Sequence, residues 1–226
     1  MAIFGNQVKK DAMLKSIFDY RLRKKEMNSF SEFMANKAAF HQYQEYISFH
    51  TDLPSLHIIK QNNVHKYREK YGFKIFIETG TYLGDMVDAQ KSYFKTVYSI
   101  ELGESLYSGA VERFKNFPHV KILLGDSGVV LKSLLAEKID QPALFWLDGH
   151  YSSGVTAKGS KNTPIMEELA VILQSPFNHG ILIDDARLFT GEADYPSIDE
   201  LASFVKARDP QRKISVADDI IRIFHD

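Results

Sequence analysis

The sequence predicts an α/β fold: a doubly wound, mainly parallel sheet, preceded by N-terminal helices and finished by an antiparallel hairpin. Two observations predict it. From residue 73 onward, short apolar runs alternate with segments of helical spacing, which is typical of a parallel sheet covered on both faces. The stretch 75–85 (IFIETGTYLGD) joins such a run to a helical pattern through two glycines, as in a strand-to-helix turn beneath a ligand.

The expected strands and helices alternate along the chain. We expect strands at 74–79, 97–101, 120–124, 143–147 and 180–184, with helices at 83–95, 104–116, 128–137 and 164–175 between them. A further helix is predicted at 198–207. The segments 213–216 and 220–224 are strand-like and only three residues apart, so they predict a hairpin with an antiparallel strand.

Residues 1–72 are predicted to form a helical appendage, and residues 73–226 a single α/β domain. Apolar residues at helical spacing run through 11–26 beside a basic cluster, which favours a solvated helix face over an anionic-partner site. Pro54 precedes another expected helix at 55–70. A second helix, capped by Ser29 or Ser31, is expected to carry aromatic residues from Phe33 to Phe49. Aromatic residues at this spacing are typical of a core or of a contact that builds a homo-oligomer, with a sugar or lipid acceptor pocket as the alternative.

The composition limits the classes of function. The 226 residues carry a net charge of -1, so no nucleic-acid binding is expected. Cysteine is absent, which excludes disulfides, thiolate metal sites and a cysteine nucleophile. We expect a cytoplasmic protein with no membrane span, because the sequence shows no signal-peptide pattern and no apolar run of sufficient length.

The turn after the first expected strand indicates the kind of ligand. Gly80 and Gly84 allow a tight turn, but Tyr82 stands where a dinucleotide turn has a glycine, which argues against NAD. Glu78 ends the strand, where a carboxylate repels a diphosphate but helps to hold a positively charged group. Glu101 ends the next strand, the position from which a carboxylate accepts both ribose hydroxyls. Adenosine without a pyrophosphate is the implied ligand.

Acidic residues also follow the other expected strands. Asp126 comes after the third strand, Asp148 after the fourth, and the pair Asp184 and Asp185 after the fifth. Because the carboxyl ends of parallel strands share one edge of the sheet, these acids are expected to lie together. Asp148, Asp184 and Asp185 carry oxygen ligands that suit Mg²⁺ or another hard divalent cation. His150 lies two residues beyond Asp148 and is a candidate general base.

Taken together, these motifs resemble a known family. The chain resembles the Rossmann-like class I S-adenosylmethionine-dependent methyltransferases, in particular the metal-dependent macrocin and sugar O-methyltransferases. The motifs that carry this resemblance are, in order, ETGTYLG, SIE, GDSG, WLDGHY and ILIDDAR. The resemblance covers about residues 73–226 and includes the terminal hairpin. It implies S-adenosylmethionine as cofactor, Mg²⁺ as metal, and a hydroxyl of a sugar or another small molecule as acceptor.

The resemblance also implies roles for individual residues. At the methionine end of the cofactor, it implies contacts from Glu78, Gly80, Thr81, Tyr82 and Gly84. It implies that Glu101 contacts the ribose, and that Asp126 and Ser127 contact the adenine. Asp148, Asp184 and Asp185 match the metal triad, and His150 falls where these enzymes place a base. Tyr82 departs from the family pattern, which has glycine there in many members. The N-terminal helices match nothing in the family.

Two other functions fit parts of the sequence. A metal-dependent hydrolase of phosphate esters could use the same aspartates, although Glu78 and Glu101 then have no evident task. A non-catalytic binding module with a methyltransferase-like fold is the third hypothesis, with the basic helices engaging a partner or a membrane surface. Loss of activity in Asp148→Ala and His150→Ala separately would favour an enzyme over the module.

Overall fold

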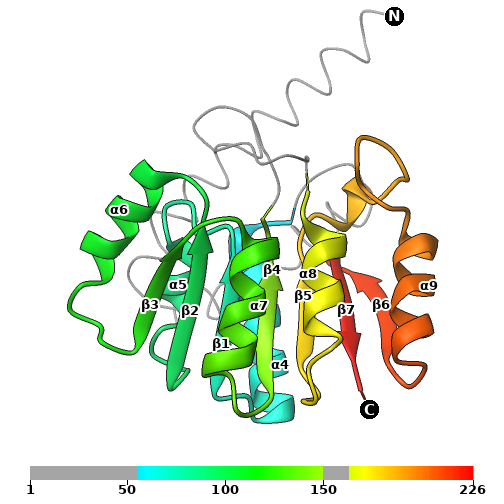
Figure 1. The fold of residues 1–226 in the computed structure, drawn as a ribbon, viewed down its shortest axis with the longest axis horizontal. Helices are drawn as coiled ribbons and strands as arrows, with labels where there is room; N and C mark the ends of the chain where they lie inside the picture. The colour runs from blue at the N-terminus through cyan, green and yellow to red at the C-terminus, as the bar shows by residue number, and fades with distance from the viewer. Residues whose placement is uncertain (1–54, 150–162, 226) are drawn as a thin grey trace, which may run out of the picture. The chain divides into compact units, whose positions relative to one another are not determined.

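The computed structural model describes residues 55–149 and 163–225. Within these ranges seven strands alternate with helices (Figure 1). The strands are β1 (Ile75–Thr79), β2 (Thr96–Glu101), β3 (Val120–Leu124), β4 (Ala143–Leu147), β5 (Gly180–Ile183), β6 (Lys213–Ala217) and β7 (Ile220–Phe224). The helices are α4 (His57–Tyr71), α5 (Asp85–Gln90), α6 (Glu104–Phe114), α7 (Ser127–Lys138), α8 (Ile165–Ile172), the short 3-10 helix η1 (Ala186–Leu188) and α9 (Ile198–Arg208).

All seven strands belong to one sheet, in the order β3-β2-β1-β4-β5-β7-β6. The strands β1 to β5 run parallel, whereas β7 is antiparallel to both β5 and β6. The predicted doubly wound sheet with a terminal antiparallel hairpin is therefore confirmed. Because β1 pairs with both β2 and β4, the strand order reverses between β1 and β4. Ligands of open α/β sheets bind at such a switch point, outside the carboxyl ends of the strands.

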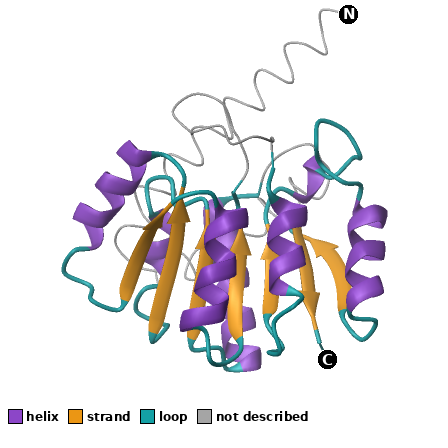
Figure 2. Cartoon of the chain, in the orientation of Figure 1, coloured by secondary structure: helices purple, strands orange, loops and turns teal. Residues whose placement is uncertain are grey.

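Helices cover both faces of the sheet (Figure 2). Successive side chains of a strand point to opposite faces, so a central strand contributes to two separate cores. In β1, Ile75 and Ile77 share a core with side chains of α7, α8 and α9, whereas Phe76 shares one with α4, α5 and α6. In β4, Phe145 belongs to the first of these cores and Trp146 to the second. Full burial of each such side chain stabilises the fold by about 1.5–3 kcal/mol, so the sheet is held from both sides.

One helix is much shorter than the sequence pattern predicted. The helix expected at 83–95 is α5, which begins after Gly84 and ends at Gln90. Gly84 precedes it with a φ of 82°, outside the helical region, and this sets the start. At the other end, the backbone N–H of Tyr93 bonds the carbonyl of Gln90 in a turn, and Phe94 enters the core at 4% exposure. Burial of Phe94 thus takes precedence over continued helical spacing.

The hairpin between β6 and β7 turns at two aspartates. Asp218 and Asp219 have φ values of 56° and 59°, the left-handed conformation of a type I′ turn, which aspartate tolerates better than most residues. Ala217 and Ile220 form the pair that closes the hairpin. The carbonyl of Asp219 accepts a hydrogen bond of 2.9 Å from the backbone N–H of Ala186 in η1. The turn therefore lies against the segment that follows β5.

The helix predicted at 55–70 is α4, and its residues from Ile59 onward belong to the same compact unit as the sheet. Val64 is fully buried in the core beside α5 and α6. Asn63 accepts a hydrogen bond of 2.8 Å from Nη2 of Arg222 in β7. These contacts fix α4 on the sheet. The rest of the predicted appendage, residues 1–54, lies outside the described residues, and the domain division of the chain at 72 and 73 stays a prediction.

Candidate active site

The carboxyl ends of β1, β2, β4 and β5 bring the expected acids to one edge of the sheet. The register pairs Thr79 with Leu147 across β1 and β4, and Leu147 with Ile183 across β4 and β5. The backbone N–H of Asp148 then bonds the carbonyl of Thr79 at 3.1 Å, and that of Asp184 bonds the carbonyl of Leu147 at 3.0 Å. The prediction that these strand-end residues lie along a common edge is borne out by the backbone ladder.

Gly80 and Gly84 shape the turn that follows β1. Gly80 has a φ of 83°, and a Cβ at this position would lie 2.4 Å from the carbonyl oxygen of Asp148. Gly84 has a φ of 82°, and its Cβ would lie 2.6 Å from the ring of Phe114. Both positions combine a left-handed backbone with no room for a side chain, so only glycine fits. The turn after β1 consequently lies directly on the backbone at the end of β4.

Glu101 holds the turn in place from the end of β2. Its two oxygens accept hydrogen bonds from the backbone N–H groups of Tyr82 (2.8 Å, to Oε2) and Gly103 (2.9 Å, to Oε1). A carboxylate has about four acceptor positions, so these two bonds leave capacity for two hydroxyl donors. Tyr82 has a φ of 49° and its side chain is largely exposed. The geometry of Glu101 is compatible with its predicted role of accepting bonds from a ribose.

Glu78 lies behind the turn and is buried, 2% exposed. Its Oε2 accepts a hydrogen bond of 2.5 Å from the hydroxyl of Ser99, and the hydroxyls of Ser99 and Thr81 lie 2.6 Å apart. Burial raises the pKa of Glu78 well above its ordinary value, and the negative charges of Asp148 and Glu101 raise it further, against the Ser99 bond. A cation close to Glu78 would favour its ionised form.

Asp126 and Ser127 stand at the start of α7, after β3. Asp126 is the N-cap of this helix, and its Oδ1 accepts a bond of 2.9 Å from the backbone N–H of Gly128. Ser127 donates from its hydroxyl to Oε1 of Glu168 at 2.5 Å. The two residues predicted at the adenine thus lie at the same edge of the sheet, and Ser127 is already engaged with a residue of α8.

Glu168 is a residue that the sequence interpretation missed. Burial raises its pKa to about 7, in opposition to the bond from Ser127. Its Oε1 lies close enough to Gly149 that a Cβ there would approach it to 3.1 Å. The sequence does contain a signal for this buried acid. The buried stripe of α8 has four positions, and Glu168 is the acid among the apolar residues Ile165, Leu169 and Ile172. A carboxyl group in an apolar stripe indicates a buried, functional or networked acid.

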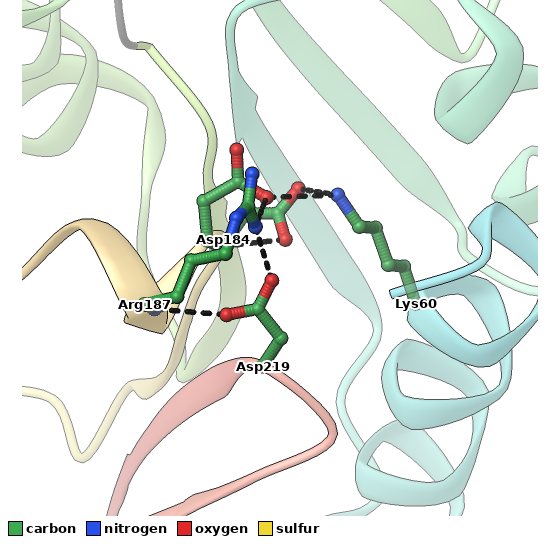
Figure 3. Close-up of polar contacts among 5 residues, drawn as sticks. Lys60, Asp184, Arg187 and Asp219 are labelled. Carbon is green, nitrogen blue, oxygen red and sulfur yellow. Dashed lines mark hydrogen bonds and ion pairs between the residues drawn. The ribbon is translucent and has the colours of Figure 1, made fainter. Parts of the chain in front are cut away.

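The acid pair after β5 binds a lysine from α4 (Figure 3). Nζ of Lys60 donates to Oδ2 of Asp184 in a short contact and lies 3.3 Å from Oδ1 of Asp185. The side chain of Asp184 is 1% exposed, and that of Lys60 is 14% exposed. Burial lowers the pKa of Lys60, but Asp184, Asp185 and Asp148 raise it by more, so the group stays an ammonium. Burial and Asp148 raise the pKa of Asp184, and Lys60 opposes this rise.

A second cation completes this cluster. Nη1 of Arg187 in η1 donates to Oδ1 of Asp185 at 2.8 Å and also contacts Oδ2 of Asp219 in the hairpin turn. The backbone N–H of Arg187 bonds Oδ1 of the same Asp219 at 2.8 Å (Figure 3). Asp185 has a φ of 54°, an uncommon conformation that these contacts hold in place. We call Lys60, Asp184, Asp185, Arg187 and Asp219 the charged cluster.

The charged cluster does not fit the predicted magnesium site. Among the residues that the structure describes, no three acidic or histidine side chains come together as metal ligands. Oδ1 of Asp184 accepts the backbone N–H of Asp185 at 2.7 Å, and its Oδ2 is taken by Lys60. A divalent cation needs these oxygens at about 2.0–2.6 Å and would meet the ammonium of Lys60 beside them. The expectation of Mg²⁺ at Asp184 and Asp185 therefore gains no support from the geometry.

Two further residues concern the site: His150, which was predicted, and Tyr195, which was not. His150, the candidate base, lies outside the described residues, so its role stays a prediction. Tyr195 follows η1, and its phenol is close enough to the charged cluster that burial and then the charges of Asp185 and Asp148 raise its pKa to about 12. Phe189 packs edge-on against Tyr195 with ring centroids 5.5 Å apart. The segment after β5 thus supplies an aromatic wall beside the cluster.

Known structures share this fold. An O-methyltransferase from Bacillus cereus in complex with S-adenosylhomocysteine (SAH) aligns over 81% of this chain and 89% of its own, with 14% identity and a TM-score of 0.53. The SAH-bound methyltransferase PaMTH1 of Podospora anserina aligns over 88% of this chain and 97% of its own, with 18% identity and a TM-score of 0.51. At these identities the likeness shows the fold, which is that of S-adenosylmethionine-dependent methyltransferases.

Comparison of sequences adds no closer relative, because neither a family model nor a curated protein matches the chain. The resemblance to the metal-dependent macrocin and sugar type, which the motifs suggested, accordingly stays a prediction. None of the helices in the described ranges has the length and apolar character needed to cross a membrane.

Proposed function

We propose that the chain is an S-adenosylmethionine-dependent O-methyltransferase that acts on a hydroxyl of a sugar or another small acceptor. The observation that carries this proposal is the turn around Gly80, which lies on the backbone of Asp148 at the point where the strand order reverses. Ligands of open α/β sheets bind at this point. The fold shared with SAH-bound methyltransferases supports the same site.

The charges around this turn favour a cationic adenosine ligand. Glu78 is buried and its hydrogen-bond partner Ser99 is a neutral donor, so an ammonium or sulfonium group beside it would be stabilised. The same carboxyl group opposes a pyrophosphate. Glu101 accepts two backbone bonds and retains acceptor capacity for two ribose hydroxyls. Tyr82 occupies the position that a dinucleotide turn leaves to glycine, which further disfavours NAD.

When bound, S-adenosylmethionine supplies an electrophilic methyl group on a sulfonium. The chain's task is to orient this group in line with the acceptor oxygen and to take up the acceptor's proton. The bound cofactor would supply the methyl carbon to which the acceptor oxygen bonds, and sulfur would keep the electron pair of the broken carbon–sulfur bond. Gly80 and Glu101 fix the position of the cofactor. His150 receives the hydroxyl proton in this proposal.

The acceptor would lie on the β4 and β5 side of the turn. The half-buried ring of Tyr195 lies there, supported edge-on by the buried Phe189, and a ring of this kind packs well against a sugar or an aromatic acceptor. A phosphoester hydrolase would need the aspartates after β4 and β5 to bind divalent cations. Asp184 and Asp185 bind Lys60 instead, so no observation favours the hydrolase.

Calorimetric titration of the full chain with SAH, with NAD as the control ligand, tests this proposal. We expect one SAH to bind per chain and NAD not to bind. Binding would then justify a screen of hydroxylated acceptors for transfer of a labelled methyl group, starting with sugars. Absence of SAH binding, whether or not NAD binds, would overturn the proposal.

A further inference from the structure

Both oxygens of Asp184, both oxygens of Asp219 and Oδ1 of Asp185 accept hydrogen bonds from the chain's own donors. Asp184 is held at both oxygens, by Lys60 and by the next backbone N–H, and its side chain is almost completely buried. Asp185 accepts at the same oxygen from Nη1 of Arg187 (2.8 Å) and from Nζ of Lys60 (3.3 Å). The two carboxylates thus converge on one ammonium group, which lies where a cation bridging them would have to lie.

The origin of Lys60 makes this arrangement a feature of the fold. Lys60 comes from α4, and it is 124 residues away in sequence from Asp184. The helix α4 is fixed on the sheet by the burial of Val64 and by the bond between Asn63 and Arg222. Because the helix is fixed, the lysine is directed at the acid pair, as Figure 3 shows. A surface lysine that paired by chance would have neither a fixed helix nor a buried partner.

We propose that the ammonium of Lys60 takes the place of a divalent cation in this protein, so that the site at the ends of β4 and β5 works without a metal. This inference deepens the proposed methyl transfer and rests on it. Lys60 holds Asp184 and Asp185 in position and supplies the positive charge that offsets them.

Titration of the metal-free full chain with Mn²⁺, followed by electron paramagnetic resonance, tests this inference. The wild type is expected to bind no Mn²⁺ below about 1 mM, the weak end of protein sites for hard cations. Lys60→Met removes the ammonium and is expected to gain a Mn²⁺ site at least about tenfold tighter, because Asp184 then lacks its cation and Asp185 keeps only Arg187. Lys60→Arg keeps the charge and is expected to behave like the wild type.

Lys66→Met is the matched control, because Lys66 lies on the exposed side of the same helix. It should leave Mn²⁺ binding unchanged. Asp184→Asn added to Lys60→Met should abolish the gained site, which would locate that site at the acid pair. A wild-type chain that binds one Mn²⁺ tightly, with loss in Asp184→Asn, would overturn the inference. So would a folded Lys60→Met variant that gains no site.

The same samples separate this inference from the proposed function. Titration of the wild type with SAH in the presence of EDTA should give the same affinity as without it. If SAH binds and the wild type also binds Mn²⁺, the metal-free site is refuted and the proposed function stands. If SAH does not bind, the proposed function fails, whatever the Mn²⁺ titration gives. The wild-type titrations need no variant, so a Lys60→Met chain that fails to fold leaves the test intact.

Discussion

The acids at the two halves of the sheet edge, the ends of β1 and β2 and the end of β5, have different kinds of partner. At the ends of β1 and β2, Glu78 and Glu101 accept hydrogen bonds from a hydroxyl and from backbone N–H groups, all of them neutral donors. At the end of β5, Asp184 and Asp185 bind the cations Lys60 and Arg187. The printed partners of the first half are therefore neutral, whereas the acids of the second half face two cations from within the protein. Strand-end acids alone do not reveal which of these two situations applies.

The largest expected effect is that of Gly80→Ala in the first half. The new Cβ would meet the carbonyl oxygen of Asp148 at 2.4 Å in a backbone that already has a φ of 83°. We expect SAH affinity to fall by at least about 100-fold and the free energy of unfolding to fall by about 3 kcal/mol. Calorimetry and urea denaturation measure the two changes. Gly109→Ala in α6 is the control: its Cβ meets nothing within 4 Å, and helix propensity predicts up to about 1 kcal/mol of added stability. Unchanged SAH binding in Gly80→Ala would remove the turn from the site.

The second prediction concerns the pH dependence of stability that Glu168 causes. Its pKa is raised by burial from 4.5 to about 7 in the folded state. The folded state thus binds more protons than the unfolded state between these values, and stability is lost as the pH rises through 7. Glu168→Gln should remove this dependence. Between pH 5 and pH 8, the unfolding free energy of the wild type should fall by about 2–3 kcal/mol more than that of the variant.

Urea denaturation at the two pH values measures the dependence, and Glu137→Gln on the exposed side of α7 is the control that should leave it unchanged. Equal losses in the wild type and in Glu168→Gln would show that Glu168 ionises normally, with a counter-charge of its own.

A smaller effect is expected from Glu101→Gln. The amide replaces a charged acceptor with a neutral one and directs an NH₂ group toward one of the backbone donors of Tyr82 or Gly103. We expect the SAH dissociation constant to rise about 10- to 100-fold, or about 1.4–2.8 kcal/mol. Glu104→Gln, at the exposed start of α6, should bind SAH like the wild type. Equal affinities in both variants would place the ribose elsewhere.

The smallest effect is expected in the second half. Arg187→Met removes the cation that joins Asp185 to Asp219 and should lower the unfolding free energy by about 1–2 kcal/mol, with SAH affinity changed less than about twofold. Lys115→Met breaks an exposed pair with Glu112 and should cost about 0.5 kcal/mol or less. Urea denaturation compares the stability of the two variants, and calorimetry compares their SAH affinity. A tenfold loss of SAH affinity in Arg187→Met would mean that the charged cluster belongs to the cofactor site.

The sequence predicted the sheet and the placement of its acids because both follow from local patterns. Periodicity identifies parallel strands, and parallel strands place their carboxyl ends, with Glu78 and Asp184, at one edge. The partner of Asp184 could not be predicted in this way. Lys60 lies on a helix whose contact with the sheet depends on the folded core, and no spacing in the sequence connects residues 124 positions apart. Glu168 is intermediate, since its place in the apolar stripe of α8 was visible but was not used.

The position of β7 has a consequence for how the chain is made. This strand is inserted between β5 and β6, and all five of its residues are buried, yet it is synthesised after every other described strand. Until it emerges from the ribosome, the hydrogen-bonding edge of β5 has no neighbour and can pair with other nascent chains. Completion of the sheet is therefore a late event, and slow translation through residues 213–224 would prolong the exposure of that edge.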